Sequence, residues 1–536
     1  MTKKQKKFEN IETLLAAGRK ITRREFIRNA AMLGISISVA SGLWSKTAEA
    51  AEPKKGGHFV LGMGHGSTTD SLDPATQENF YATNFGYTRH NHIAEVSPEG
   101  KLVPELAESW EATPDAKTWH YKVRRGVEFH NGKTLEAEDF ITSINHHRNE
   151  ESKSPAKALL KAMVDIKTDG KHAFTITLKG GDAGFPYIIS DYHIPIMPTK
   201  DGKTDWQSGI GAGPYKVDSY EPGVSARLSR FPNYWKLPHR AHFDSIEMLT
   251  IADTSARTNA LKTGSIHAMD RCDLKTVHLL KKVPKLRIED VTGFAHYTMP
   301  MHTKKAPFDN NDVRLALKLA IDREAILKTV LRGYGVVGND HPISPANEFH
   351  ASELPQRKYD PEKAKHHVKK SGVGTLKVKL HAAKAAFDGA TDAAVLCSEH
   401  AAKAGIEIQV VRAPNDGYWS NIWTKVGWCM CYWGGRPTED WMFTTAYAAD
   451  AAWNDAHWEH KRFNELLIKG RAELDPKKRR EIYVELQRIV RDEGGTVVPL
   501  FNNYVFACAD KVKHGPHIAG NWDLDGEKIN ERWWFA

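Results

Sequence analysis

A strand–helix–strand pattern in residues 374–413 constrains the fold of this chain more than any other feature. The segments "GTLKVKLHAA" and "GIEIQVVRA" are predicted as strands, and "TDAAVLCSEHAAKAG" between them is predicted as a helix. Parallel strands need such a crossover connection. The pattern therefore predicts a βαβ unit, which is typical of α/β proteins.

The rest of the chain extends this alternation beyond a single hydrophobic core. A length of 536 residues predicts two or three domains. A strand is predicted in "GGHFVLGMGHG", a hairpin turn at Asn131-Gly132 and a helix in "EAEDFITSINHHRN". Further helices are predicted in "DNNDVRLALKLAIDREAILKTVL" and "DPKKRREIYVELQRIVRDEG". Together, these patterns predict an α/β protein of two lobes.

Most of the net positive charge of the chain lies in its first fifty residues. The formal net charge is +9, but residues 1–50 hold ten Lys/Arg against four Asp/Glu and so supply six of the nine charges. No basic stripe or binding motif accompanies the remaining charge, so nucleic acid is not an expected partner.

The same fifty residues carry features of an export signal. Arg23 and Arg24 precede a weakly apolar segment, residues 30–44, which is too short to span a bilayer. Small residues at Ala48 and Ala50 suit a signal peptidase. The pattern resembles a twin-arginine signal, so we expect cleavage near Ala50, a soluble periplasmic chain and the twin-arginine export machinery as a partner. An amphipathic N-terminal helix is the alternative interpretation.

Five cysteines follow the leader: Cys272, Cys397, Cys429, Cys431 and Cys508. An oxidising compartment permits disulfides, but an odd number leaves at least one thiol unpaired in a monomer. Two residues that lie two apart share one face of a strand and are poorly placed to bridge each other. Burial as small apolar side chains is therefore the simpler interpretation.

Five blocks of the sequence resemble one protein family, in the family's order. They are "LVPELAESWEATPDAKTWHYKVRRGVEFHNGKTLEAEDFITSI", "GAGPYKVDSYEPGVSARLSRFPNYW", "APFDNNDVRLALKLAIDREAI", "PISPANEF…YDPEKAKHHVKKSG" and "RDEGGTVVPLF". This set is similar to the extracellular solute-binding proteins of family 5, the peptide, oligopeptide and nickel receptors of ABC importers. The resemblance runs from about Gly56 to the C-terminus.

The resemblance implies an α/β, two-lobed periplasmic binding protein-like fold (type II, cluster C) with an extra N-terminal subdomain. It implies a signal peptide at 1–50, lobe I at 51–291, lobe II at 292–498 and a return to lobe I at 499–536. Hinge strands would lie near Thr292–His302 and Val497–Phe501. It also implies a receptor without catalysis or cofactor that delivers a peptide or peptide-like solute to an inner-membrane ABC permease. We expect a monomer.

The stretch "GWCMCYWGGRPTEDWMF", residues 427–443, is the strongest candidate for a ligand-binding segment. It is predicted as a strand that ends at Gly434-Gly435, followed by a loop with Arg436, Glu439 and Asp440. The family's Trp-x-x-Asp…Phe pattern implies that Arg436 stands where peptide receptors hold the α-ammonium with an aspartate. A guanidinium instead grips a carboxylate or a phosphate.

Two hypotheses follow for this loop. Either Glu439 or Asp440 meets the ligand's amine, or the ligand presents an anion to Arg436; a zwitterion would suit all three side chains. The alternative is that Arg436 pairs with one of these acids at the surface. The complete set of candidate ligand-binding residues is Trp433, Arg436, Glu439, Asp440, Trp419, Tyr432, His65, Thr69, Tyr87, Phe387 and Asp388.

Each remaining candidate has a structural alternative. Trp419 resembles a pocket-lining aromatic residue of peptide receptors, but core packing would explain it equally well. His65, Thr69 and Tyr87 are expected on lobe I loops that face the cleft, where surface or turn roles are the alternative. Phe387 and Asp388 follow a lobe II strand at a position near the ligand in relatives.

Other function classes fit the sequence less well. A metal-complex or haem receptor of the same fold is the main alternative, favoured by 26 histidines and Cys429-x-Cys431. The Cys-x-x-Cys and His-x-x-x-His spacings of zinc sites are missing, so no metal site is predicted. A secreted hydrolase is a lesser alternative, because the sequence has no Gly-x-Ser-x-Gly or His-Glu-x-x-His motif. A receptor of this fold that serves sensing or chaperoning also stays open.

Overall fold

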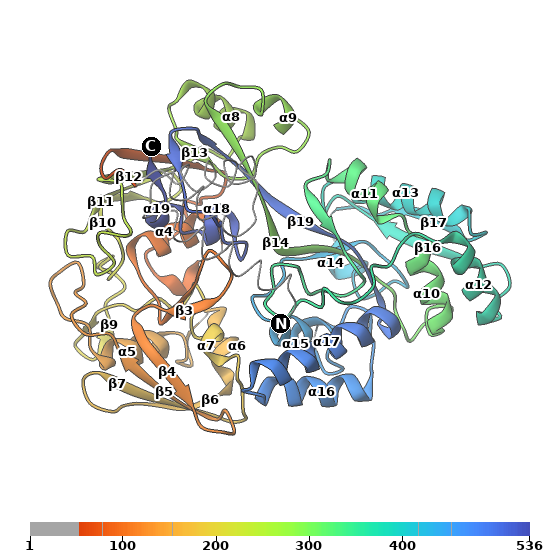
Figure 1. The fold of residues 1–536 in the computed structure, drawn as a ribbon, viewed down its shortest axis with the longest axis horizontal. Coiled ribbons are helices and arrows are strands. Elements are labelled where there is room, and N and C mark those ends of the chain that lie inside the picture. The colour runs from red at the N-terminus through yellow and green to blue at the C-terminus, as the bar shows by residue number, and fades with distance from the viewer. Residues whose placement is uncertain (1–52, 78, 153, 416–417, 452) are drawn as a thin grey trace, which may run out of the picture.

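The computed structural model describes residues 53–536 except 78, 153, 416–417 and 452. The predicted twin-arginine leader and its cleavage site lie outside these residues. Within the described part of the chain, no helix combines the length and the apolarity needed to span a bilayer. Figure 1 shows two bodies joined by the long strands β14 (Leu286–Pro300) and β19 (Thr496–Ala509). We call the body on the left of Figure 1 lobe I and the body on the right lobe II.

The largest sheet of the described residues is shared by both lobes. Its strands run in the order β10-β11-β12-β1-β13-β19-β14-β18, and β15 also pairs with β19. The pairs of β1 with β12 and with β13 are parallel, and the other pairs are antiparallel. The remaining bounds are β1 (His58–Met63), β10 (Tyr215–Glu221), β11 (Ser225–Arg230), β12 (Ser245–Thr250), β13 (Ala268–Met269), β15 (Gly335–Val337) and β18 (Cys431–Trp433).

The two long strands form the connection between the lobes. At about 3.3 Å per residue they reach roughly 50 Å, which is long enough to contribute to both lobes. Their pairing register shifts between Thr292 and His296, where Gly293 packs against the ring of Tyr504 so closely that a Cβ atom would collide with it. Ladder hydrogen bonds are interrupted at such an irregularity, so the two strands are paired least regularly there.

Lobe I carries a second sheet in the order β4-β5-β7-β6. Its core is aromatic: Tyr121 and Phe174 stack with their ring centroids 4.9 Å apart. The predicted helix in "EAEDFITSINHHRN" is confirmed as α5. The bounds here are β4 (Ala107–Ala112), β5 (Thr118–Val123), β6 (Met163–Thr168), β7 (Ala173–Leu178), η1 (Pro74–Thr76), α4 (Phe80–Arg89), α5 (Ala137–His146), α6 (Ala156–Leu159), η2 (Leu160–Ala162) and α7 (Phe185–Ile188).

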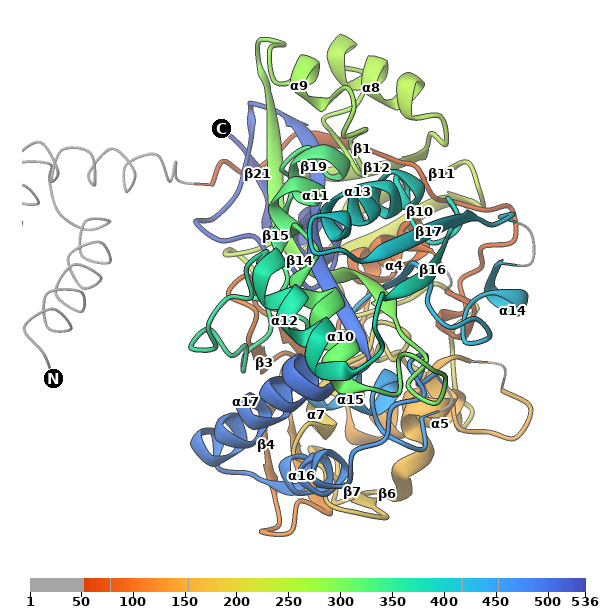
Figure 2. The ribbon, with the colours of Figure 1, turned by 90° about the vertical axis from the view of Figure 1, so that its right-hand side faces the viewer.

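Lobe II contains the βαβ unit predicted from the sequence. Strands β16 (Lys377–Ala382) and β17 (Glu407–Arg412) pair in parallel, and α13 (Ala390–Ala402) connects them. Figure 2 shows this unit beside α10–α12. The other helices of lobe II are α10 (Asn311–Leu319), α11 (Arg323–Val330), α12 (Pro361–Ser371), α14 (Tyr418–Asn421), α15 (Glu439–Ala446), α16 (Lys461–Ala472) and α17 (Pro476–Glu493). Helices α8 (Thr254–Thr263), α9 (Val277–Leu280), α18 (Asp523–Gly526) and α19 (Ile529–Arg532) belong to lobe I.

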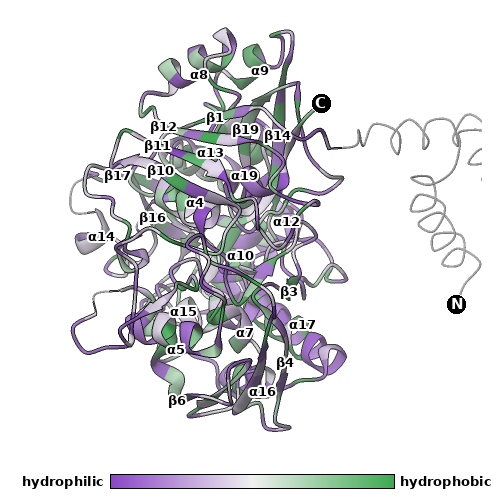
Figure 3. Ribbon diagram, turned by 90° about the vertical axis from the view of Figure 1, so that its left-hand side faces the viewer, coloured by the Kyte–Doolittle hydropathy of each residue, from purple (hydrophilic) through white to green (hydrophobic). Residues whose placement is uncertain are grey.

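The segment 309–331 differs from its prediction as a single helix. It forms two helices, α10 and α11, because the side chain of Asp322 accepts a hydrogen bond from the backbone N–H of Ala325 and caps a new helix. The predicted long helix near the C-terminus is confirmed as α17. Figure 3 shows α17 as largely hydrophilic, since only a stripe that includes Tyr483, Leu486 and Val490 faces the core.

Short two-stranded ribbons complete the described structure, and the C-terminal residues return to lobe I. Strand β21 pairs with β20 there, and Phe535 packs its ring against Phe59 of the main sheet. The ribbon strands are β2 (Ala94–Val96), β3 (Leu102–Pro104), β8 (Thr199–Lys200), β9 (Lys203–Thr204), β20 (Val512–Lys513) and β21 (Trp534–Phe535).

Candidate functional site

The largest cavity among those described lies between the lobes, and we call it the cleft cavity. Its volume is about 720 Å³. Lobe I contributes Thr254 and the loop 271–275, and Tyr297 of the connecting strand β14 also lines the cavity. Lobe II contributes residues 329–332, Lys384 and residues 388–392. Cationic and acidic side chains from both lobes face this space: Arg271, Lys275, Arg332 and Lys384, with Asp273, Asp388 and Asp392. Such a mixed lining suits a ligand that carries charges of both signs.

A second cavity marks where the lobes meet, and we call it the seam. Lobe II supplies Pro437 and Trp441, and lobe I supplies residues that include Asp191, Tyr192 and Lys528. Its interior is about 30 Å³, which is room for about one water molecule. The two lobes are therefore in close approach along this line.

A third cavity of about 150 Å³ opens on the lobe I side of the seam. Its walls are the rings of His65, Phe80, Tyr192 and Trp522, and we call it the aromatic box. Tyr192 and Trp522 line the seam as well, so the box and the seam are neighbours along one face of lobe I.

Arg436 stands at the seam rather than in the cleft cavity. Its side chain is half-buried, its guanidinium lies 5.8 Å from the centroid of the Trp441 ring, and it donates to the carbonyl of Gly435 at 2.6 Å. Burial lowers the pKa of Arg436, while the nearby Asp191 and Tyr192 of lobe I act in the opposite direction. Among the described residues, no carboxylate lies within ion-pair distance of this guanidinium. The alternative of a surface pair with Glu439 or Asp440 is therefore not what the structure shows.

Glu439 and Asp440 were expected in a loop beside Arg436, and this expectation is wrong. Both belong to the first turn of α15, because Thr438 caps that helix by accepting from the N–H of Trp441. Glu439 accepts from the backbone N–H of Phe349 at 2.8 Å, and burial raises its pKa to about 7.

Asp440 instead pairs with Arg471 at 3.1 Å. The carboxylates of Glu439 and Asp440 are thus committed to partners within the protein and do not line the seam or the cleft cavity. A zwitterion held jointly by Arg436 and these two acids does not fit this geometry.

Three of the four aromatic candidates of lobe II divide into one core residue and two surface residues. Trp433 is buried, and its ring N–H donates to Asp455 at 3.3 Å, so it packs in the core beneath β18. Trp419 and Tyr432 are exposed and meet edge to face with their ring centroids 5.6 Å apart. Of the predicted strand at residues 426–433, only Cys431–Trp433 is regular, and Trp428 and Cys429 form isolated bridges.

The remaining candidates fall at different places in or beside the cavities. His65 lines the aromatic box, Tyr87 lines the seam, and Asp388 lines the cleft cavity. Phe387 stacks on Tyr297 at 3.8 Å, so it supports the wall of the cleft cavity. Thr69 is exposed and hydrogen-bonds to Ser67, which matches the turn role given as its alternative.

Several lining residues were not predicted. Trp441 lies within the stretch that was singled out, and recognition of Thr438 as an N-cap would have placed it in the first turn of a helix. Arg271 and Trp522 come from segments about 250 residues apart, and no short-range pattern connects them. Only the fold brings these side chains to one face.

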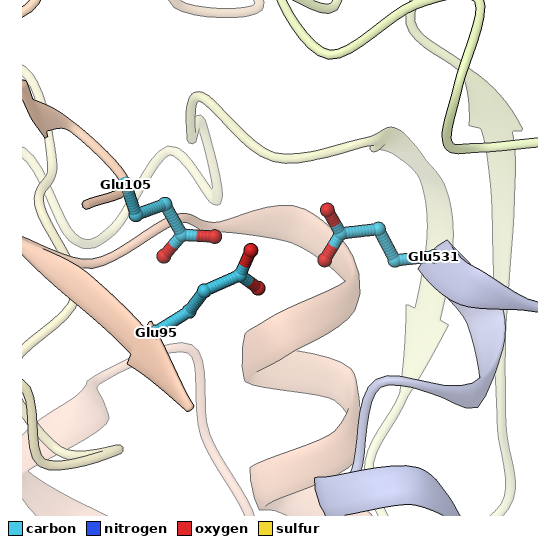
Figure 4. Close-up of side chains that lie close together, drawn as sticks. All are labelled: Glu95, Glu105 and Glu531. Carbon is cyan, nitrogen blue, oxygen red and sulfur yellow. The ribbon is translucent and has the colours of Figure 1, made fainter. Parts of the chain in front are cut away.

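A cluster of three glutamates is the one group of the described residues with a geometry that could hold a metal ion. Oxygens of Glu95, Glu105 and Glu531 lie within 4.8 Å of one another, as Figure 4 shows. The space is already occupied by protein cations: Lys236 lies 2.6 Å from Glu105, and Lys528 lies 2.6 Å from Glu95. The cluster is therefore a buried ion network and does not fit a metal. All five cysteines are buried and unpaired, which confirms the simpler interpretation of them.

A direct contact between the lobes lies beside α15. The backbone N–H of Ala183, between β7 and α7, donates to the carbonyl of Arg471 at 2.7 Å. Asp182 precedes it and is buried near Asp440, Arg471 and Arg479. Burial, and next the charge of Asp440, raise the pKa of Asp182 to about 6. The contact between the lobes thus brings the carboxyl groups of Asp182 and Asp440 together.

This contact predicts that closure depends on pH. A carboxyl whose pKa is raised in the closed state binds protons more tightly there, so closure is favoured below the ordinary pKa and weakens as pH rises through about 6. We expect ligand affinity to fall by roughly tenfold between about pH 5 and about pH 8, because Asp182 loses its proton in this range. Asp182→Asn should remove most of this dependence, as measured by calorimetry at both values. An equal dependence in the variant would contradict the assignment.

Comparison with known proteins agrees with this two-lobed geometry. The family model "Bacterial extracellular solute-binding proteins, family 5 Middle" matches residues 101–455. The glutathione-binding protein GsiB of Escherichia coli O6:K15:H31 (strain 536 / UPEC) is 24% identical over 510 residues, which cover 91% of this chain and 95% of that protein. Di/tripeptide-binding protein 1 of Pseudomonas aeruginosa (strain UCBPP-PA14) is 25% identical over 474 residues, or 81% of this chain and 86% of that protein.

A solved structure has a similar two-lobed fold. The ABC transporter-associated periplasmic binding protein DppA of Helicobacter pylori, in complex with the peptide STSA, superposes with a TM-score of 0.69 at 21% identity. The match covers 90% of this chain and 99% of that chain. The chain belongs to family 5 of the bacterial extracellular solute-binding proteins.

Proposed function

We propose that this chain is the exported, periplasmic receptor of an ABC importer and that it binds a peptide or a peptide-like solute between its lobes. The observation that carries the proposal is the cleft cavity, which both lobes line across the strand β14. Its volume of about 720 Å³ lies within the range of about 300–1,000 Å³ that is typical of small-molecule sites. Hinge closure around such a site is a standard way for two lobes to capture a ligand.

The lining supports a zwitterionic ligand such as a short peptide. Four cationic and three acidic side chains of the cleft cavity offer partners for both ends of such a molecule. The relatives named above bind glutathione and di- or tripeptides, which is consistent with this chemistry. We extend the proposal to a monomeric receptor that performs no catalysis and engages an inner-membrane permease. Export by the twin-arginine machinery stays part of the proposal.

Calorimetry and small-angle X-ray scattering with the same protein sample test this function. We expect glutathione or a di- or tripeptide to bind with micromolar or tighter affinity and free amino acids to bind more weakly. The bound protein should also have a smaller radius of gyration, because the lobes close. Binding without any closure, or the absence of binding across the panel, would contradict the proposed function.

A further inference from the structure

The aromatic box is a cavity built from rings that come from four separate parts of lobe I. Phe80 opens helix α4, His65 follows strand β1, Tyr192 follows α7, and Trp522 precedes α18. The ring of Trp522 lies 6.0 Å from that of Phe80 and 5.8 Å from that of Tyr192, measured between centroids. His65 and Phe80 stack at 6.0 Å. The rings thus surround one space instead of collapsing onto one another.

The polar groups at the base of the box already have partners. Thr83 donates its hydroxyl to the carbonyl of Asn79 at 3.1 Å. The amide of Asn79 caps α4 through the N–H of Ala82 and donates to Asp70 at 2.6 Å. A group that enters the box therefore gains contact mainly with ring faces and edges. A volume of about 150 Å³ is close to that of an apolar cavity that admits benzene.

Arg271 does not line the box itself, but it contacts two of the box's walls, His65 and Phe80. Its guanidinium hydrogen-bonds to His65 Nε2 and lies 4.8 Å from the centroid of Phe80. The residue adopts a left-handed φ of 45°, a strained conformation for a non-glycine residue that needs support from its surroundings. The adjacent Asp270 supplies that support, because it accepts from the N–H of Gly64 at 2.9 Å, next to His65.

The charge of Arg271 also decides which side chains can enter. Burial, and next the charge of Arg271, lower the pKa of His65 to about 4, so the imidazole is neutral at physiological pH and adds no second cation. Arg271 nevertheless places a positive charge directly against the His65 and Phe80 walls of the box. A lysine or arginine side chain would lose its hydration in the box and meet a like charge, whereas a phenyl ring would meet neither penalty.

We propose that the aromatic box is a specificity subsite that takes one phenyl-sized, uncharged side chain of the bound peptide and rejects cationic side chains. The inference rests on the proposed function, because it assumes that the ligand is a peptide. Arg271 lines the cleft cavity and also contacts His65 and Phe80 of the box, so a peptide backbone in the cleft cavity lies close to the box.

The test compares tripeptides by calorimetry with the mature protein. Ala-Ala-Ala is the reference, and phenylalanine or lysine is placed in turn at each position, because the register of the peptide is unknown. At one position we expect phenylalanine to improve affinity by about 10- to 100-fold over alanine, and lysine to bind no better than alanine.

A second experiment fills the aromatic box with a larger side chain. Thr83→Leu adds apolar volume at the base of the box and should bring the phenylalanine-to-alanine affinity ratio close to one. The matched control Thr263→Leu lies on the exposed surface of α8 and should keep the wild-type ratio. The wild-type ratio tests the inference even if the Thr83 variant fails to fold.

The possible outcomes distinguish failure of the proposed subsite from failure of the proposed receptor function. If tripeptides bind the wild type but phenylalanine gives no advantage at any position, the subsite is wrong and the receptor function stands. If lysine binds as tightly as phenylalanine, the role of Arg271 is wrong. If no tripeptide binds, the proposed function fails and the inference fails with it.

Discussion

Replacement of Lys528 by methionine should lower the free energy of unfolding by about 3–5 kcal/mol, the cost of breaking a buried ion pair. Its ammonium lies 2.6 Å from Glu95 and 2.8 Å from Glu105, and its side chain is only 3% exposed. Methionine keeps the volume of the stem but leaves these carboxylates without one of their cations. Urea unfolding followed by circular dichroism measures the loss.

The network around Lys528 explains the size of this effect. Glu95, Glu105 and Glu531 are balanced by Lys236, Lys528 and Arg532, and all six side chains are buried or nearly so. Burial alone would raise the pKa of Glu531, but the charges of Lys236 and Lys528 hold it down to about 2. The ionised carboxylate of Glu531 therefore stabilises the folded protein above the ordinary pKa of glutamate, and this contribution to the free energy of unfolding is lost as pH falls toward about 2. The deficit of the variant should therefore shrink in acid.

Two controls make the Lys528 prediction specific. Lys171→Met removes the exposed partner of Glu136 and should leave the free energy of unfolding almost unchanged, because solvent screens that pair. Combining Lys528→Met with Glu105→Gln restores the charge balance, so the double variant should recover part of the loss. A loss of less than about 1 kcal/mol for Lys528→Met alone would contradict the buried network.

Replacement of Arg436 by alanine should weaken ligand binding by about 2–4 kcal/mol, which corresponds to roughly 30- to 1,000-fold in affinity. The guanidinium stands at the seam against Trp441, near Asp191 and Tyr192 of the opposite lobe. It is thus placed to join the two lobes when they close around the ligand. Arg436→Lys should also lose affinity, because an ammonium cannot form the same planar, two-pronged contact.

Calorimetry with the tightest peptide of the panel measures this change. Arg412→Ala is a suitable control, because Arg412 is exposed at the end of β17 and lines none of the three cavities. An Arg436→Ala protein that unfolds at the wild-type temperature and binds with unchanged affinity would exclude Arg436 from ligand binding.

Local patterns predicted those parts of the fold that local forces decide. The βαβ unit at β16, α13 and β17 was predictable because each element carries its own periodicity and the crossover dictates a parallel pair. The break between α10 and α11 was also readable in principle, because Asp322 is a typical N-cap residue. The same holds for Thr438, whose cap moves Glu439 and Asp440 from a loop into a helix.

The site was less predictable because its residues meet only through the long strands and the return of the C-terminus. Trp433 has an indole N–H that needs a partner when buried, and Asp455 supplies it from another segment. Asp440 finds Arg471 in the same way. Arg271 and Trp522 could not be connected to His65 without the order of β1, β13 and β19 in one sheet. Sequence therefore located Tyr87 and Arg436 at the seam, but not Pro437 and Trp441, which also line it.

Native mass spectrometry of the mature chain, purified gently from periplasm, tests the central claim most directly. A receptor that closes on its solute should retain it, so we predict an added mass of a small organic molecule that disappears on acid denaturation. Fragmentation of that molecule would also show whether it is a peptide. A protein that never carries a solute, and that also fails to bind any member of the peptide panel, would contradict the account.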